Sequence, residues 1–362
     1  MQRQKETVEI TTNSDEFLFV LVPGLYGSKL YCNCCFFNSN QSNSRRLYPP
    51  YGYVGNINEH FYECKNITCK PLKKILKISI YEKFLKRMRK KAQTISLAYN
   101  WTDDPLENAK KLQGQLLDII ACKRVKNIII IGHSMGGLIV RIMCEYLQLP
   151  SLHPTINFTF VICGTPFYGS LNEHDYNYDI NDLKTMKPFF LLTSHDFNKM
   201  IDVYKTSISY LAPSNRVIST SNNEQIKKIH SCLSKFRFYG INYKYIFYYN
   251  LSHTTKIYRT MNIDVFNSNF NIGNFKVQNS TNTLIKVITN EPSDGKIIKP
   301  TLIPHNTVIA LDFEYLPHAL MLNSKYIVKI LTNLMTTTTT TTIDNNAPSA
   351  PPPSYESLYA ID

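Results

Sequence analysis

Residues 127–147 read NIIIIGHSMGGLIVRIMCEYL, and this stretch decides the fold. Its first part, Asn127 to Ile131, is a short run of β-branched residues that is typical of a fully buried strand. Its last part, Met135 to Leu147, has the apolar spacing of an amphipathic helix. A tight turn, Gly132 to Gly136, joins the two. A buried strand that passes directly into a helix is typical of a parallel sheet covered by helices.

The same alternation of strand and helix continues on both sides of this stretch. Further apolar runs that predict buried strands occur at Phe17 to Val22, Thr94 to Tyr99, Asn157 to Cys163, Lys244 to Tyr249 and Thr307 to Leu311. Helical patterns lie between several of them, at Ser79 to Lys91, Pro105 to Cys122 and Ala319 to Met335. The whole pattern predicts an α/β protein with a mostly parallel, doubly wound sheet.

The chain is expected to contain one folded domain. Residues 17–335 carry the alternation, after a polar segment of residues 1–16. Two long segments with weak periodicity, around 31–70 and 171–240, interrupt it, and we expect them to form cap or lid insertions over the strand ends. Residues 336–362 are Thr-rich and then Pro-rich, which predicts a disordered tail.

Composition and charge narrow the class of protein further. Of the 362 residues, 43% are hydrophobic, so the chain is able to bury a sizeable core. Lys and Arg total 40 against 27 Asp and Glu, and the formal charge of +13 favours an anionic partner. The N-terminal residues lack the apolar core of a signal peptide, and no run approaches the roughly 20 apolar residues of a membrane-spanning helix. We therefore expect a cytoplasmic protein with peripheral membrane contact at most.

The nine cysteines are odd in number and spread over a long chain, which favours free thiols in a reducing compartment. A cluster near the N-terminus allows three interpretations: ordinary thiols in a loop, a local disulfide, or a metal site. Its members are Cys32, Cys34, Cys35, Cys64 and Cys69. Because the spacing matches no zinc pattern, we assign no metal and no cofactor.

The turn after the Asn127 to Ile131 strand carries the strongest chemical signal. It is a G-x-S-x-G sequence, Gly132-His133-Ser134-Met135-Gly136, placed between a strand and a helix. Such a junction forces a sharp backbone reversal, and the two glycines leave room for a serine that projects from the sheet edge. Ser134 is therefore the candidate nucleophile.

A serine hydroxyl needs an imidazole to take its proton and a carboxylate to hold that imidazole in the right tautomer. His318 is the candidate base, because it follows the Thr307 to Leu311 strand and precedes the last helix, as the chain order serine, acid, histidine requires. His305, the other late histidine, comes before that strand.

The acid is expected on a turn that follows a strand, between the second insertion and the histidine. Asp294 meets this description, in Ser293-Asp294-Gly295 after LIKVITNEP, although an Asp-Gly pair is also simply a good turn. The rival carboxylates are Asp264, Glu291 and Asp312.

Acyl transfer builds an oxyanion, which backbone N–H groups stabilise when they point at one spot. The glycine-rich turn Pro23 to Ser28 follows the first strand, so the Leu25 amide is a candidate donor. The Met135 amide, next to the nucleophile, is its expected partner.

These segments resemble the lipase branch of the α/β-hydrolases, and within it the lecithin:cholesterol acyltransferase and lysosomal phospholipase family. The resemblance rests on VLVPGLYGSKL (20–30), AYNWTDDP (98–105), IIIIGHSMGGL (128–138), FVICGTPFYGS (160–170), SDG (293–295) and PHALM (317–321). It spans most of residues 17–335 and implies an α/β-hydrolase fold with cap or lid insertions.

The resemblance also implies roles for single residues. It places Ser134, Asp294 and His318 in a catalytic triad, the Leu25 and Met135 amides in the oxyanion hole, and Trp101 near the acyl pocket. Asn100-Trp101-Thr102 stands where the family usually has Asp-Trp-Arg.

A basic amphipathic segment, Lys70 to Lys91, contains ten Lys or Arg and one Glu. One interpretation is a helix that covers the sheet and turns a solvated basic side outward. The other is a surface that rests on anionic lipid. Nucleic acid binding is not expected, since no recognition motif accompanies the charge.

The tail carries a PPxY sequence at Pro352, Pro353 and Tyr355. A Pro-rich segment in the polyproline II conformation loses little entropy on docking, which makes a WW-domain protein a candidate partner.

Taken together, the residues predict a serine lipase or phospholipase that hydrolyses lipid acyl esters through an acyl-enzyme on Ser134. Two alternatives stay open. One is an acyltransferase of the same fold, and the other is an inactive hydrolase-fold adaptor that recruits WW-domain partners through its tail.

Overall fold

The structure is a computed structural model. It describes residues 16–32, 45–48, 66–75, 77–123, 125–165, 239–250, 253–262, 276–281, 284–293, 308–311 and 316–337.

The described strands form one large sheet and three small ones. The large sheet has the strand order β10-β11-β9-β8-β1-β7, and β15 also pairs with β11. Its strands are β1 (Phe17–Val22), β7 (Gln93–Ser96), β8 (Asn127–His133), β9 (Asn157–Cys163), β10 (Tyr239–Gly240), β11 (Tyr243–Asn250) and β15 (Val308–Leu311). All neighbours run parallel except β10, which forms a hairpin with β11.

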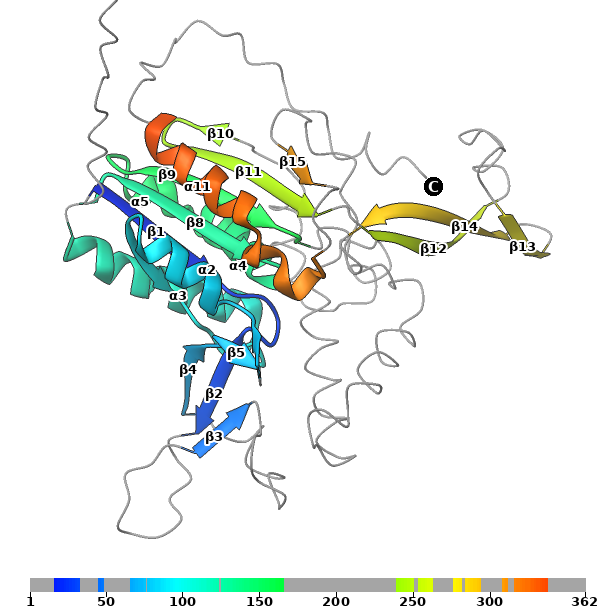
Figure 1. The fold of residues 1–362 in the computed structure, drawn as a ribbon, viewed down its shortest axis with the longest axis horizontal. Helices are drawn as coiled ribbons and strands as arrows, with labels where there is room; N and C mark the ends of the chain where they lie inside the picture. Colours follow the sequence, from blue (N-terminus) through cyan, green and yellow to red (C-terminus); the bar gives the residue numbers. More distant parts are fainter. Residues whose placement is uncertain are drawn as a thin grey trace, which may run out of the picture.

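Helices cover both faces of this sheet (Figure 1). One face is covered by α3 (Pro105–Ala121), α4 (Met135–Arg141), the π-helix η2 (Ile142–Tyr146) and α5 (Leu149–Leu152). The other face is covered by α2 (Glu82–Arg89), the 3₁₀ helix η5 (His318–Asn323) and α11 (Lys325–Thr337). The predicted doubly wound α/β fold is confirmed.

Burial on both faces explains the apolar strand sequences. In β1, Leu18, Val20 and Val22 pack into the core that contains α3 and α4. The alternate residues, Phe17, Phe19 and Leu21, pack into the core that contains α2 and α11, so all six residues are buried. A continuous apolar run is what a strand covered on both sides requires.

Three small sheets complete the described strands, and Leu30 and Cys32 of one of them pack into the core that contains α3 and α4. β2 (Ser28–Cys32), β3 (Arg45–Tyr48) and β4 (Ile67–Pro71) form one, and β5 (Lys74–Ile75) and β6 (Ile78–Ser79) form a short hairpin. A third sheet, β12 (His253–Asn262), β13 (Lys276–Thr281) and β14 (Leu284–Ser293), extends away from the carboxyl end of β11 (Figure 1).

Two predicted helices differ in detail from the structure. The predicted helix Ala319 to Met335 is divided, because Ser324 ends η5 and its Oγ accepts a hydrogen bond from the Tyr326 N–H, which begins α11. The basic segment Lys70 to Lys91 is not one helix, since it contains part of β4 and the β5–β6 hairpin before α2.

The insertions and domain limits are only partly described. The first insertion contributes β3 and β4 to the sheet around β2, whereas the second lies almost entirely outside the described residues, as do residues 1–15 and 338–362. The predicted domain boundaries stay predictions. None of the helices in the described ranges has both the length and the apolar character needed to cross a bilayer.

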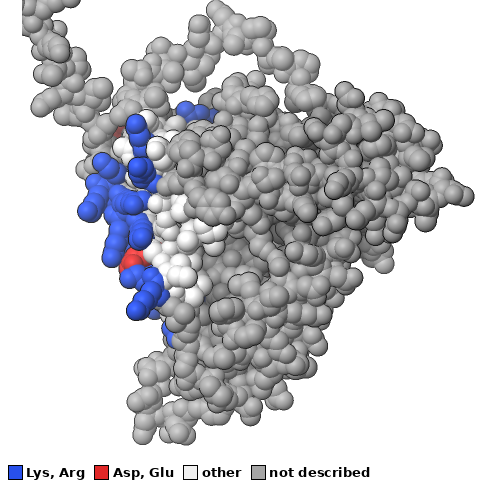
Figure 2. Space-filling view, turned by 45° about the vertical axis from the view of Figure 1, so that its right-hand side comes forward, with Lys and Arg blue, Asp and Glu red and all other residues white. Residues whose placement is uncertain are grey.

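The ten cations of the Lys70 to Lys91 segment are all exposed, and we call them the basic surface. They are Lys70, Lys73, Lys74, Lys77, Lys83, Lys86, Arg87, Arg89, Lys90 and Lys91. On the described surface, Lys and Arg gather in a strip that acidic side chains scarcely interrupt (Figure 2). Glu82 bridges two of the cations, Lys74 at 2.9 Å and Lys86 at 3.4 Å.

Candidate active site

Ser134 lies on a strained turn between β8 and α4. Its backbone has φ 54° and ψ −129°, a conformation that costs a serine about 1–3 kcal/mol and persists only when its surroundings enforce it. Three hydrogen bonds do so: the Ser134 N–H donates to the Cys163 carbonyl at 2.9 Å, and the Ser134 carbonyl accepts from the Gly137 N–H and the Thr165 hydroxyl, both at 2.9 Å. Between Ile131 and Val140, Ser134 is the one residue that is not buried.

The turn after β1 packs directly against this serine. A Cβ atom on Gly24 would lie 2.8 Å from the Ser134 Cβ, closer than real Cβ atoms approach. A Cβ atom on Gly136 would meet the backbone carbonyls of Val22 and Pro23. The glycines therefore allow the ends of β1 and β8 to touch.

His318 lies beside the same turn, although it is 185 residues from His133 in the chain. The His133 Nε2 is 3.0 Å from the His318 carbonyl oxygen, and the two imidazole centroids are 5.0 Å apart with an angle of 31° between the rings. The segment that follows β15 thus returns to the end of β8. The structure thus places His318 against His133, the residue that precedes Ser134.

Tyr81, which directly precedes α2, completes this cluster. Its hydroxyl is 2.8 Å from the His133 Nδ1 and accepts a hydrogen bond from the Gly24 N–H at 3.0 Å. The Tyr81 side chain is buried, and burial raises the pKa of its hydroxyl far above the ordinary value, so the group stays protonated. In the sequence, Tyr81 is one of the apolar positions of the Lys70 to Lys91 segment, and no local pattern marks it as part of a site.

The two predicted oxyanion donors lie at the ends of neighbouring strands. Leu25 is in the turn after β1, where Tyr26 has φ 59° and the Gly27 N–H closes the turn on the Gly24 carbonyl at 2.9 Å. Met135 is the first residue of α4, and the first N–H groups of a helix have no partner within the helix. Their role stays a prediction.

Trp101 is buried under the turn after β1. Its Nε1 donates to the Ser28 carbonyl at 3.2 Å, and its ring packs edge-on against Tyr26, with centroids 4.8 Å apart. Trp101 therefore packs against the turn after β1, which carries the predicted oxyanion donor Leu25. The predicted role near an acyl pocket stays untested.

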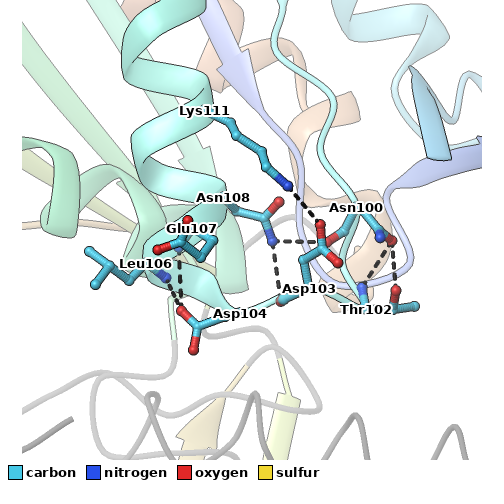
Figure 3. A network of polar contacts seen from close by, with 8 residues as sticks. All are labelled: Asn100, Thr102, Asp103, Asp104, Leu106, Glu107, Asn108 and Lys111. Atoms are coloured by element: carbon cyan, nitrogen blue, oxygen red, sulfur yellow. Dashed lines mark hydrogen bonds and ion pairs between the residues drawn. The ribbon is translucent and has the colours of Figure 1, made fainter. Parts of the chain in front are cut away.

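A polar network fixes the turn that carries Trp101 (Figure 3). The Asn100 Oδ1 accepts from the Thr102 N–H at 3.2 Å and from its hydroxyl at 2.8 Å. The Asn108 amide donates to the Asn100 and Asp103 carbonyls, and Asp104 caps α3 by accepting from the Leu106 N–H at 2.8 Å. The Asn-Trp-Thr turn is thus held both by its own hydrogen bonds and by Asn108 of α3.

Asp294 lies outside the described residues. The pairing of β12 with β14 gives the position of Ser293, the residue that precedes it. Ser293 pairs with His253, which follows the end of β11 by three residues. The β12–β14 excursion therefore returns the chain to the carboxyl end of β11. Of the rivals, Glu291 pairs with Thr255 within β14, and Asp264 and Asp312 lie outside the described residues.

The cysteine cluster is described only in part. Cys32 is buried in β2, and burial, with a contribution from Asp103, raises the pKa of Cys69 to about 12. Cys34, Cys35 and Cys64 lie outside the described residues, as do Pro352, Pro353 and Tyr355 of the tail. Within the described ranges no group of His, Cys, Asp or Glu is suited to hold a metal ion. The WW-domain partner stays a prediction.

The parallel sheet with helices on both faces, and the strained serine at the end of β8, define an α/β-hydrolase. A model of the lecithin:cholesterol acyltransferase family matches residues 71–296, which is more than half of the 362-residue chain. The chain therefore belongs to the lecithin:cholesterol acyltransferase family, and the family points to an enzyme that transfers or hydrolyses lipid acyl groups. The comparison with individual curated proteins gave no match.

Proposed function

We propose that this protein is a serine lipase or phospholipase that uses Ser134, His318 and Asp294 to hydrolyse lipid acyl esters. The observation that carries the proposal is the strained Ser134 turn with the His318 segment beside it. Strain of this kind persists where the surrounding structure enforces it, and it is concentrated at functional sites.

In the proposed reaction, the Ser134 Oγ attacks the ester carbonyl carbon while the His318 imidazole takes its proton. The Leu25 and Met135 amides stabilise the oxyanion, and Asp294 orients the imidazolium. The alcohol then leaves with the proton from His318, and an acyl group stays on Ser134. Water, activated by His318, attacks this acyl-enzyme and releases the fatty acid. A second alcohol in place of water gives the acyltransferase alternative.

A fluorophosphonate probe tests the nucleophile. We expect the probe to label the full-length protein and to leave Ser134→Ala unlabelled, because only an activated serine displaces fluoride from phosphorus. Ser151→Ala, which changes an exposed serine on α5, is the matched control and should label like the wild type.

Equal labelling of Ser134→Ala and wild type would remove Ser134 from the mechanism. A wild-type protein that never reacts, while its tail still binds a WW domain, would favour the inactive adaptor.

We further propose that the basic surface docks on anionic lipid. Next to this surface, burial first and then the nearby cations Arg46, Lys73 and Lys70 lower the pKa of Lys29 on β2. Each cation held near an anionic membrane contributes about 1 kcal/mol of binding free energy. A surface of ten exposed cations therefore suits a lipid interface better than isolated lysines would.

The β5–β6 hairpin places part of this surface at the active-site end of the sheet. The Lys73 carbonyl accepts from the N–H groups of Ile80 and Tyr81, and the Tyr81 hydroxyl reaches the His133 ring. Ile78, on this hairpin, is 54% exposed. An exposed apolar side chain among lysines is suited to the boundary between head groups and acyl chains.

A further inference from the structure

We infer that the Tyr81 hydroxyl is a positioning group for the proposed catalysis, because it fixes the His133 ring that holds the His318 segment. The inference rests on the proposed function. It concerns a chain of three hydrogen bonds that joins the turn after β1, the end of β8 and the start of η5.

The His318 carbonyl, at the end of this series of hydrogen bonds, determines which group donates in each of them. The His318 carbonyl oxygen only accepts, so the proton must be on the His133 Nε2. When the ring is neutral, Nδ1 then has a lone pair, and the Tyr81 hydroxyl donates to it. The Tyr81 oxygen is left to accept from the Gly24 N–H, at 3.0 Å.

The chain connects the three segments that the proposed reaction needs. Gly24 adjoins Leu25, the predicted oxyanion donor, and His133 adjoins Ser134. His318 carries both the carbonyl at the end of the chain and the imidazole that we propose as the base. The Tyr81 hydroxyl therefore sets the spacing between these three segments without touching the reacting atoms in this mechanism.

Removal of this one hydroxyl leaves two buried polar groups without their partner, the His133 Nδ1 and the Gly24 N–H. The ring is then no longer restricted to the tautomer that donates to His318. The His318 segment loses a fixed contact at 3.0 Å, and a displacement of about 1 Å at a catalytic base slows a reaction by up to about 100-fold.

Tyr81→Phe tests the inference, with Tyr99→Phe as the matched control. Both variants delete a buried tyrosine hydroxyl, but within the described structure the Tyr99 hydroxyl has no hydrogen-bond partner. The readouts are the rate of fluorophosphonate labelling, kcat and KM for a soluble ester, and the unfolding midpoint. We expect Tyr81→Phe to lower kcat and the labelling rate about 10- to 100-fold with KM unchanged. Tyr99→Phe should stay within about twofold of wild type.

A second pair of variants tests which of the hydrogen bonds made by His133 matters for the labelling rate. His133→Gln is able to place an amide N–H near the position of Nε2, toward the His318 carbonyl, whereas His133→Asn reaches only the position of Nδ1, toward Tyr81. We expect His133→Gln to keep a larger share of the labelling rate. Combining Tyr81→Phe with His133→Asn should slow labelling little more than His133→Asn alone, because the hydroxyl acts through the ring.

Each outcome separates this inference from the proposed function. Wild-type protein that labels at Ser134, with Tyr81→Phe labelling at the same rate, overturns the inference and leaves the function standing. Equal slowing by Tyr81→Phe and Tyr99→Phe, in step with equal losses of stability, also overturns it. Wild-type protein that does not label at Ser134 contradicts the function itself.

Discussion

Three of the four residues with positive φ in the described ranges lie at one end of the sheet. Tyr26 follows β1, Ser134 follows β8, and Gly164 follows β9, with φ values of 59°, 54° and 52°, whereas the fourth, Gln148, precedes α5. The three strands are neighbours, so the strained residues Tyr26 and Ser134 lie along the carboxyl edge where α/β proteins bind ligands. Backbone strain held at one edge by close packing indicates that the edge, and Ser134 within it, is selected for function more than for stability.

A glycine substitution tests this close packing. Gly136→Ala places a methyl group against the carbonyls of Val22 and Pro23, which are backbone atoms that cannot rotate away. We expect it to lower the free energy of unfolding by about 1–3 kcal/mol and to slow labelling of Ser134. Gly114→Ala in α3 is the control: its methyl group meets open space, so stability should rise by about 0.5–1 kcal/mol. Denaturant unfolding measures the free energy of unfolding of both variants. A Gly136→Ala variant as stable as wild type would contradict the packing argument.

The sequence could predict a site with Ser134 and His318, and the structure places His318 against His133, next to Ser134. The sequence could not reveal Tyr81. The G-x-S-x-G turn and the position of His318 after the last strand are local signals that a known chain order connects. Tyr81 looks like any apolar residue of an amphipathic segment, because its partner, His133, is 52 residues away. Only the three-dimensional pairing distinguishes a hydroxyl that orders a site from one, like that of Tyr99, that merely fills the core.

At the scale of elements, a buried ion pair connects α4 to η2, the helix that follows it. Arg141, the last residue of α4, makes two hydrogen bonds to Glu145, at 2.8 and 2.9 Å, and both side chains are 4% exposed. Burial alone would lower the pKa of Arg141, but the Glu145 carboxylate raises it above the ordinary value. Tyr245 of β11 donates to the same carboxylate at 3.1 Å, so the pair also connects the helical segment that follows Ser134 to the sheet.

Breaking this pair should be costly because it leaves a buried charge. We expect Arg141→Met to lower the free energy of unfolding by about 3–5 kcal/mol, and the double variant Arg141→Met/Glu145→Leu to recover most of that loss. Lys110→Met, which removes an exposed pair with Glu107, is the control and should unfold like wild type. Denaturant unfolding checks all three. A single Arg141→Met variant as stable as wild type would show that the pair does not anchor α4.

The sequence predicted elements correctly where burial alone determines conformation, but not where the pattern suits two structures or where pairing depends on distant residues. β1 and β9 have the predicted limits, Phe17–Val22 and Asn157–Cys163, since a strand covered on both faces needs a continuous apolar run. The β5–β6 hairpin in the basic segment was not predicted, because alternating Lys and Ile residues are compatible with a short strand as well as with a helix. The pairing of β12 with β14 depends on partners far apart in the chain, which periodicity does not encode.

At the scale of the whole molecule, positive charge is unevenly distributed. The segment from Lys70 to Lys91 contributes ten exposed cations, and Lys325 and Lys329 of α11 are exposed on the same side of the sheet. Composition predicts the excess charge, but only the fold shows that α2 and α11 share a face. This arrangement permits a test in which the same amount of positive charge is removed from one face or from the other.

Vesicle binding measures whether that face docks on lipid. The triple variant Lys83→Gln/Lys90→Gln/Lys91→Gln removes cations from the α2 side, and the control Lys110→Gln/Lys111→Gln/Lys123→Gln removes the same charge from the α3 side. Both are made in the Ser134→Ala background, so that the lipid is not consumed.

With three cations each worth about 1 kcal/mol at the membrane, the first variant should bind phosphatidylserine-containing vesicles about 100-fold more weakly. The control variant should lose much less vesicle affinity. Added salt should weaken the binding of wild-type protein to vesicles, and vesicles of pure phosphatidylcholine should bind the protein poorly. Equal losses in the two triple variants would show that net charge, and not the basic surface, attracts the protein to the membrane. Binding that ignores both salt and phosphatidylserine would reject anionic lipid as the partner.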